Sequence, residues 1–184
     1  MDQVGDSLDQ ALEGAYTRPI PKTAQARMKY LVKQYKSTKA VAQALGVSQR
    51  TVERYVAGHL KRPRKALADR MEREVKKRWQ PQVRARAKQK AARSDGIVVS
   101  TRARFGFTAA PGSTDDARVR HITQALPPHW AKRLFEARDA GSTEEQLRDI
   151  AAQGLGEMYF RDSGRRAHDL MVEFTDVEDI EIGL

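Results

Sequence analysis

Residues 111–116 of the chain, PGSTDD, bring two hydroxyl side chains next to two carboxylates. Ser113 and Thr114 follow a Pro-Gly pair, which places them on a surface turn. An exposed hydroxyl of this kind can attack a phosphate when metal ions offset the negative charge. Asp115 and Asp116 could hold Mg²⁺, but two acids on a turn more often begin a helix. We therefore expect no metal site here, and the motif favours a helix start with one spare hydroxyl.

Few other residues are spaced for chemistry. The chain has no Cys, which excludes disulfides and thiolate chemistry. It contains no Walker loop and no dinucleotide fingerprint. Ser100, with Arg102 and Arg104 on the same segment, is a candidate for recombinase-like strand transfer, but it lacks a convincing nucleophile setting. The four histidines are His59, His121, His129 and His168. No two of them have the spacing of metal ligands.

Charge divides the chain into three segments. Residues 1–21 carry a net charge of −3, residues 22–104 carry +19, and residues 105–184 carry −6. The +19 block is the electrostatic footprint of a protein that binds a polyanion, because each neutralised phosphate releases counterions. An anionic membrane surface is the main competing partner. There is no membrane-spanning apolar run and no signal peptide, so we expect a cytoplasmic protein with no membrane partner.

The clearest structural pattern runs from Thr38 to Gly58. Ser37 or Thr38 can cap a first helix, and Gly46 can take the left-handed conformation that ends it. Ser48 can then cap a second helix. A helix, a short glycine-containing turn and another helix predict a helix-turn-helix. An αα-hairpin within a helical bundle is the alternative interpretation.

A helix-turn-helix places the start of its second helix in the major groove of DNA. The outward residues there are predicted to read bases, with Arg bonding guanine and Gln bonding adenine. The basic run that follows is predicted to clamp phosphates or enter the minor groove. The expected DNA-binding residues are Gln49, Arg50, Thr51, Arg54, Lys61, Arg62, Arg64 and Lys65.

The remaining patterns predict a mainly α fold with a small β element, formed by an N-terminal helix-turn-helix and a C-terminal α+β region. Apolar spacing predicts helices over 7–16, 22–35, 64–79, 115–126, 129–141 and 144–160. Residues 97–108 predict a strand, and the acidic tail from His168 predicts β structure that pairs with it. The expected domains are an acidic segment (1–21), a helical DNA-binding region (22–93) and an α+β region (94–184).

The order of these motifs resembles the terminal proteins of Streptomyces-type linear chromosomes and plasmids. The resemblance covers the whole chain, through its acidic N-terminus, KAVAQALGVSQRTVERYVAG, KRPRK, IVVSTRARFGF and its acidic tail. Each motif is generic, whereas their order is specific. The resemblance implies covalent attachment to 5′ DNA ends at the telomere, so that the protein is nucleoid-associated there.

The same resemblance implies a protein primer rather than an enzyme. A side-chain hydroxyl would accept the first deoxynucleotide, and a DNA polymerase would extend it to patch the recessed end. The partners would be telomeric DNA, the polymerase and a telomere-associated protein. No intrinsic cofactor is implied; Mg²⁺ and dNTP belong to the polymerase reaction. The alternative is a helix-turn-helix DNA-binding regulator without covalent chemistry.

Such an acceptor must be exposed, and Thr114 meets this requirement best. If Ser113 caps the following helix, the hydroxyl of Thr114 stays available at a phosphate-attracting helix N-terminus. If Thr114 is the cap, Ser113 is the spare hydroxyl, and another hydroxyl remains a further alternative. We expect the tyrosines to be poor acceptors, because they fall in apolar helical patterns or in the core. They are Tyr16, Tyr30, Tyr35, Tyr55 and Tyr159.

Overall fold

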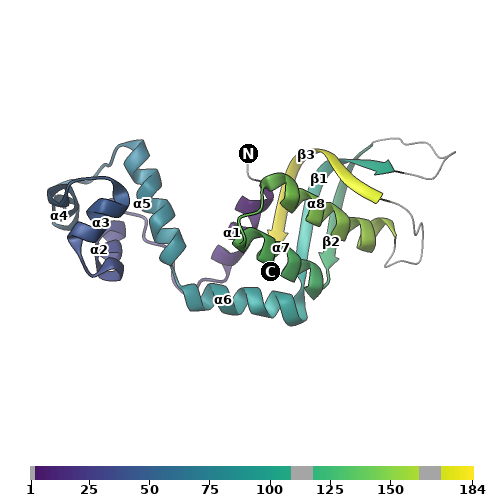
Figure 1. Cartoon of the computed structure of the whole chain (residues 1–184), viewed down its shortest axis with the longest axis horizontal. Coiled ribbons are helices and arrows are strands. Elements are labelled where there is room, and N and C mark those ends of the chain that lie inside the picture. The colour runs from purple at the N-terminus through teal and green to yellow at the C-terminus, as the bar shows by residue number, and fades with distance from the viewer. Residues whose placement is uncertain (1–2, 109–117, 162–170) are drawn as a thin grey trace. The chain divides into compact units, whose positions relative to one another are not determined.

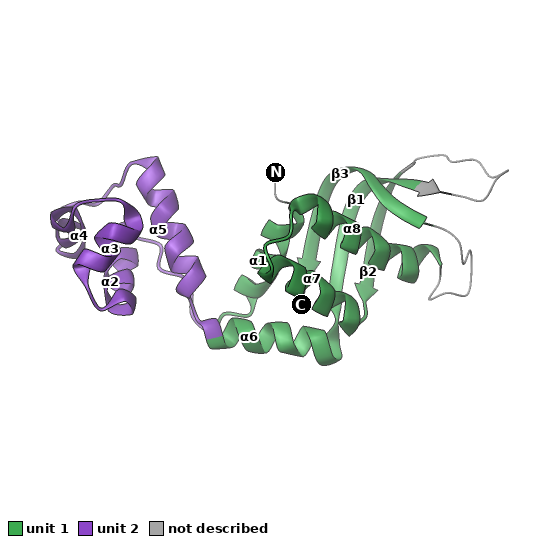
Figure 2. Ribbon diagram, in the orientation of Figure 1, with its two compact units in different colours: residues 1–16, 82–184 green, residues 17–81 purple. Residues whose placement is uncertain are grey.

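The computed structural model describes residues 3–108, 118–161 and 171–184. It is mainly helical with a small antiparallel sheet of three strands, as the sequence predicts (Figure 1). The chain forms two compact units (Figure 2). We call residues 1–16 with 82–184 unit 1, and residues 17–81 unit 2.

Unit 2 consists of four helices around one apolar core. They are α2 (Ala24–Tyr35), α3 (Thr38–Leu45), α4 (Gln49–Val56) and α5 (Lys65–Arg78). The predicted stripe on α5 is confirmed, because Leu67, Met71 and Val75 are all buried. The other buried core residues are Met28, Leu31, Val41, Ala42, Leu45, Val52 and Tyr55.

Unit 1 is formed by two segments of the chain, one before and one after unit 2. It contains α1 (Gln3–Gly14), most of α6 (Pro81–Lys90) and a π-helical turn (Ala91–Asp95), followed by β1 (Ile97–Thr108) and β2 (Arg118–Leu126). The chain then continues through α7 (Pro128–Asp139), α8 (Glu144–Leu155), a second π-helical turn (Gly156–Phe160) and β3 (Met171–Gly183). Pro81 therefore begins a new helix, where its missing N–H leaves no bond unmade.

The sheet has the order β2-β1-β3, with both pairs antiparallel. The predicted pairing of the acidic tail with the basic strand is confirmed, because Arg102 lies opposite Asp179 and Arg104 opposite Asp176. The Arg102 Nε atom also lies 2.6 Å from a carboxylate oxygen of Glu178. Opposite charges on neighbouring strands help to fix this pairing.

The helix predicted over 115–126 is wrong, because residues 118–126 form β2. The apolar residues Ile122 and Leu126 are four apart, a spacing that suits one face of a helix and also one face of a strand. Both side chains are buried, and their backbones pair with β1. Tertiary pairing decided between two periods that the local pattern could not separate.

Helix α1 belongs to the core of unit 1 although it is the first element. Val4, Leu8 and Leu12 recur every four residues and are at most 1% exposed. The Glu144 carboxylate accepts hydrogen bonds from the Val4 and Gly5 backbone N–H groups, at 2.8 and 3.3 Å, which satisfies the start of the helix.

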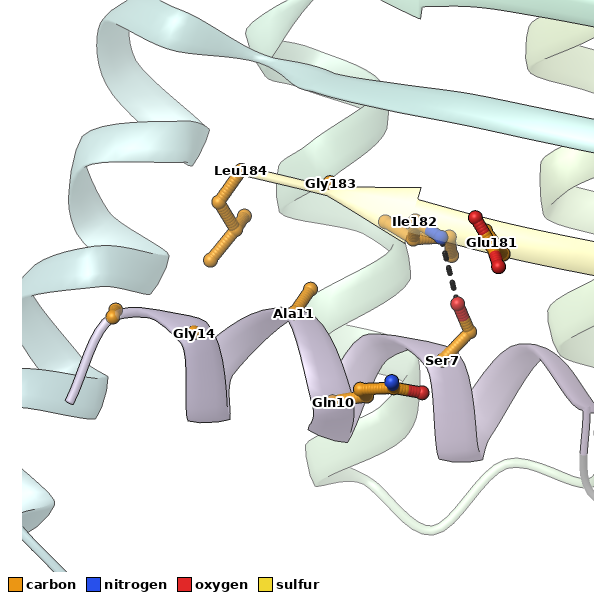
Figure 3. Close-up of a pocket in the computed structure, with 9 residues that line it drawn as sticks. Ser7, Gln10, Ala11, Gly14, Glu181, Ile182, Gly183 and Leu184 are labelled. Atoms are coloured by element: carbon orange, nitrogen blue, oxygen red, sulfur yellow. Dashed lines mark hydrogen bonds between the residues drawn. The ribbon is translucent and has the colours of Figure 1, made fainter. Parts of the chain in front are cut away.

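A second polar contact joins α1 to the last strand. The Ser7 hydroxyl oxygen accepts the Ile182 backbone N–H of β3 at 2.7 Å, a contact visible in Figure 3. On the same helix, Asp9 forms ion pairs with Arg84 at 3.4 Å and Arg138 at 2.9 Å. Apolar, hydrogen-bonding and ionic contacts therefore all hold α1 within unit 1.

The compact units do not follow the boundaries expected from composition. Residues 1–16 pack with the C-terminal region, and unit 2 is an insertion between α1 and α6. The two ends of unit 2 are joined by hydrogen bonds. The Thr17 N–H and hydroxyl donate to the Gln80 side-chain oxygen at 3.1 and 2.9 Å, and the indole N–H of Trp79 donates to the Arg18 carbonyl at 3.2 Å.

We predict that Leu8→Ala destabilises unit 1 by about 2–5 kcal/mol, because it removes a fully buried side chain. Each unit contains one of the two tryptophans, so Trp130 reports unit 1 and Trp79 reports unit 2. In a Trp79→Phe background, Trp130 fluorescence during urea unfolding should show a lower midpoint. Gln10→Ala, on the exposed side of α1, is the matched control. Equal midpoints for both variants would contradict the assignment of α1 to the core.

Candidate nucleic-acid interface

The predicted helix-turn-helix is present in unit 2. The Ser37 side chain caps α3 by accepting the Ala40 N–H, and the Ser48 side chain caps α4 by accepting the Thr51 N–H. Gly46 lies between the helices with a φ of 62°, in the left-handed region where glycine has no side-chain penalty. The polar caps and the glycine therefore define the sharp turn locally.

Helix α4 separates an inner side from an outer side. Val52 and Tyr55 face the core, and both are buried. The outer residues are Gln49, Arg50, Glu53 and Arg54, all of them exposed. Three of these four were predicted to contact bases. The outer side of α4 thus carries two arginines that no described residue pairs with.

Thr51 does not belong to this outer row. Its side chain is half-buried, and its hydroxyl lies 2.9 Å from the Ser48 hydroxyl oxygen. The same Ser48 side chain accepts the Thr51 backbone N–H at 3.2 Å. The structure therefore engages Thr51 in the cap of α4, away from the exposed residues predicted with it.

Sequence reasoning missed Glu53. Its side-chain oxygen accepts a hydrogen bond from the Gln49 amide nitrogen at 2.9 Å. Residues four apart are neighbours on a helix surface, so the Gln49–Glu53 spacing was the signal that could have revealed it. The outer side of α4 carries an acid and an amide as well as its arginines.

The basic run after α4 is open to solvent. Lys61, Arg62, Arg64 and Lys65 are all exposed, and none pairs with an acid among the described residues. Pro63 holds the middle of the run, and Lys65 begins α5. Four unpaired cations close in sequence to α4 form a surface suited to phosphate oxygens.

Positive charge is concentrated in unit 2. That unit has 18 Lys and Arg against four acids, a net charge of +14, whereas unit 1 has a net charge of −4. Two of the four acids, both on α5, are already paired. Glu72 lies 3.1 Å from Arg27 of α2, and Glu74 pairs with Arg78 of α5. The unit that contains the helix-turn-helix is therefore also the strongly basic one.

Thr114 and Ser113 lie outside the described residues. The segment that contains them, 109–117, connects β1 with β2 in the sequence. Because β2 replaces the predicted helix, the capping arrangement and the helix N-terminus proposed for this segment lose their support. The assignment of Thr114 therefore rests on the exposure expected for a Pro-Gly turn and on the family resemblance.

Three tyrosines in unit 2 are engaged. The Tyr30 hydroxyl donates to the Arg78 carbonyl at 2.6 Å, and the Tyr35 hydroxyl donates to the Glu74 carboxylate at 2.7 Å. Burial raises the pKa of both phenols, which disfavours the nucleophilic phenolate. Tyr55 is 4% exposed.

The expected burial of Tyr159 is wrong, because this side chain is 44% exposed. It lies in the π-helical turn after α8, where its ring meets Phe160 edge-on at 4.9 Å. The apolar neighbours in sequence suggested a core position, but the wider turn directs this ring outward. Tyr159 therefore stays among the hydroxyls that an attachment experiment must consider.

Other candidate sites have little chemistry to offer. The Ser100 hydroxyl lies 2.9 Å from the Thr123 hydroxyl on the sheet. This partner is another hydroxyl and not a side chain that could act as a general base. A groove of 430 Å³ between α1 and the end of β3 is lined by three polar side chains, those of Gln10, Glu181 and the already bonded Ser7. Within the described ranges, no three His, Asp or Glu side chains gather to bind a metal.

Comparison with protein-family models, curated proteins and solved structures finds no match to this chain. No helix in the described ranges combines the length and apolar character that crossing a membrane requires.

Proposed function

We propose that the chain is a telomere terminal protein of linear replicons, which binds DNA through unit 2 and serves as protein primer for end patching. The DNA-binding part is carried by one observation. Arg50 and Arg54 are exposed on the outer side of α4, the second helix of the helix-turn-helix. The unit that contains them has a net charge of +14.

Docking follows from this geometry. With α4 in the major groove, Arg50 and Arg54 can bond guanine O6 and N7, and Gln49 can contact an adjacent base. The exposed cations from Lys61 to Lys65 reach phosphates, so their contribution depends on salt and not on sequence. Positioning and base reading would thus come from neighbouring parts of one unit.

The covalent part of the proposal rests on the resemblance to terminal proteins. In that reaction the Thr114 hydroxyl oxygen attacks the α-phosphorus of a dNTP, a new P–O bond forms, and pyrophosphate leaves. The hydroxyl proton passes to solvent or to a base of the polymerase. Two Mg²⁺ ions of the polymerase would stabilise the attacking and leaving oxygens. The chain supplies the hydroxyl, and the polymerase supplies the catalysis.

We predict that Arg50→Ala and Arg54→Ala each weaken specific DNA binding by about 1–3 kcal/mol, the value of one guanine contact. Fluorescence anisotropy with telomeric and scrambled duplexes at fixed salt would measure the change. Arg73→Ala is the matched control, because Arg73 is exposed on α5. It should weaken both duplexes by a similar small factor. If it reduces discrimination as much as the α4 variants do, α4 is not the reading helix.

We predict that Thr114→Ala abolishes transfer of labelled deoxynucleotide to the chain, whereas Thr114→Ser retains it. The assay combines the protein with Mg²⁺, α-labelled dNTP, telomeric DNA, the DNA polymerase and the telomere-associated protein. Ser113→Ala is the control and should label normally. Full labelling of Thr114→Ala would overturn the assignment, and alkali would then distinguish a labile Ser linkage from a stable Tyr159 linkage.

The same assay tests the alternative function. A helix-turn-helix regulator would bind duplex DNA with the expected dependence on Arg50 and Arg54, yet no variant would accept a nucleotide. DNA binding without labelling therefore favours the regulator.

A further inference from the structure

Glu53 stands out in the electrostatics of unit 2. The other three acids of the unit, Asp69, Glu72 and Glu74, all lie on α5. Glu53 instead lies on the outer side of α4, between Arg50 and Arg54, and is exposed. A carboxylate on a surface that approaches phosphates opposes binding to every DNA sequence. A contact that only some sequences provide would offset this repulsion.

The hydrogen bond to Gln49 fixes what this pair displays. Carboxylate oxygens only accept hydrogen bonds, so the amide nitrogen of Gln49 must be the atom that faces Glu53. The carbonyl oxygen of Gln49 is then turned away from Glu53. The second oxygen of Glu53 makes no hydrogen bond or ion pair with a described residue. The pair therefore presents acceptor oxygens, flanked by arginines that are donors only.

This inference rests on the proposed binding of α4 in the major groove. We propose that Glu53 determines specificity by accepting a hydrogen bond from the N4 amino group of a cytosine. Only cytosine and adenine offer an amino donor in that groove. Both amino groups have an oxygen of the partner base on one side. On the other side adenine carries the acceptor N7, which repels a carboxylate, whereas cytosine carries only C5–H. Charge thus selects cytosine over adenine.

Rejection of other bases comes from the same charge. Guanine O6 and thymine O4 are acceptors, so either would face the carboxylate oxygen with no shared proton. Such a juxtaposition leaves a desolvated negative charge without a partner, which is discrimination by repulsion. Arg50 and Arg54 favour guanine on either side. The expected site is consequently rich in G·C pairs, with one cytosine position that depends on Glu53.

The test uses the full chain and a pool of random duplexes of about 20 base pairs, long enough for two turns of the helix. Wild-type protein, Glu53→Gln and Asp69→Asn each select bound duplexes, which are then sequenced. Asp69 is exposed on α5, so its variant makes the same charge change away from α4. Trp79 fluorescence, measured in a Trp130→Phe background, checks that each variant keeps unit 2 folded.

Wild-type protein should enrich cytosine at one position and discriminate there by about 5- to 150-fold, as one base contact does. Glu53→Gln should lose the preference at that position and keep the others, while binding unrelated duplexes more tightly. Asp69→Asn should keep every preference.

Three results would overturn the inference alone: an unchanged pattern for Glu53→Gln, loss of an adenine in place of a cytosine, or the same loss in Asp69→Asn. A wild-type protein that binds no duplex would overturn the DNA-binding proposal and this inference together.

Discussion

A sheet of three strands cannot bury its apolar face unless helices cover it, and this constraint organises unit 1. Helices α1, α7 and α8 pack beside the sheet (Figure 1), and their buried residues belong to one core with those of β1. Helices from both ends of the chain are needed for this cover. The Glu144 carboxylate and the Ile182 backbone hold α1 in place. In the sequence, unit 2 is consequently an insertion between two segments that share one core, and its own ends are joined by the hydrogen bond between Thr17 and Gln80.

The two units also differ in charge. In unit 1, the cationic side chains of β1 lie opposite the acids of β3, and Arg102 forms an ion pair with Glu178. In unit 2, the cations from Lys61 to Lys65 have no acidic partner among the described residues. Long-range attraction of a polyanion therefore acts mainly on unit 2. The charge pattern supports DNA binding by that unit independently of its fold.

The local signals explain which parts of the fold were predictable. The helix-turn-helix depends on Ser37, Gly46 and Ser48, whose partners lie within a few residues of each, so sequence reasoning identified it. Helix α1 was assigned to a separate acidic segment because its partners lie 140 and 175 positions away. Residues 118–126 were predicted as a helix because the Ile122–Leu126 spacing fits both periods.

The same distinction, between features set by local spacing and features set by the folded structure, applies to the candidate site. Arg50 and Arg54 followed from helical spacing, and the structure exposes both. Glu53 was not predicted because a carboxylate repels phosphates, although its spacing from Gln49 fits a neighbouring pair on a helix. The engagement of Thr51 with Ser48 depends on cap geometry that sequence alone leaves open. The assignment of Thr114 depends on the family resemblance, and this residue lies outside the described ranges.

The insertion of unit 2 also sets an order for folding during translation. Among the described elements, α1 leaves the ribosome first, and β3, which it contacts through Ser7, leaves it last. Unit 2 draws all of its core from residues 17–81, so it can close while synthesis continues. Until α7, α8 and β3 have emerged, Val4, Leu8 and Leu12 lack the full set of apolar partners that they have in the folded unit. Among the described helices, α1 is thus the one with the longest delay between its synthesis and the synthesis of its partners. During that delay its apolar side is accessible to chaperones and proteases.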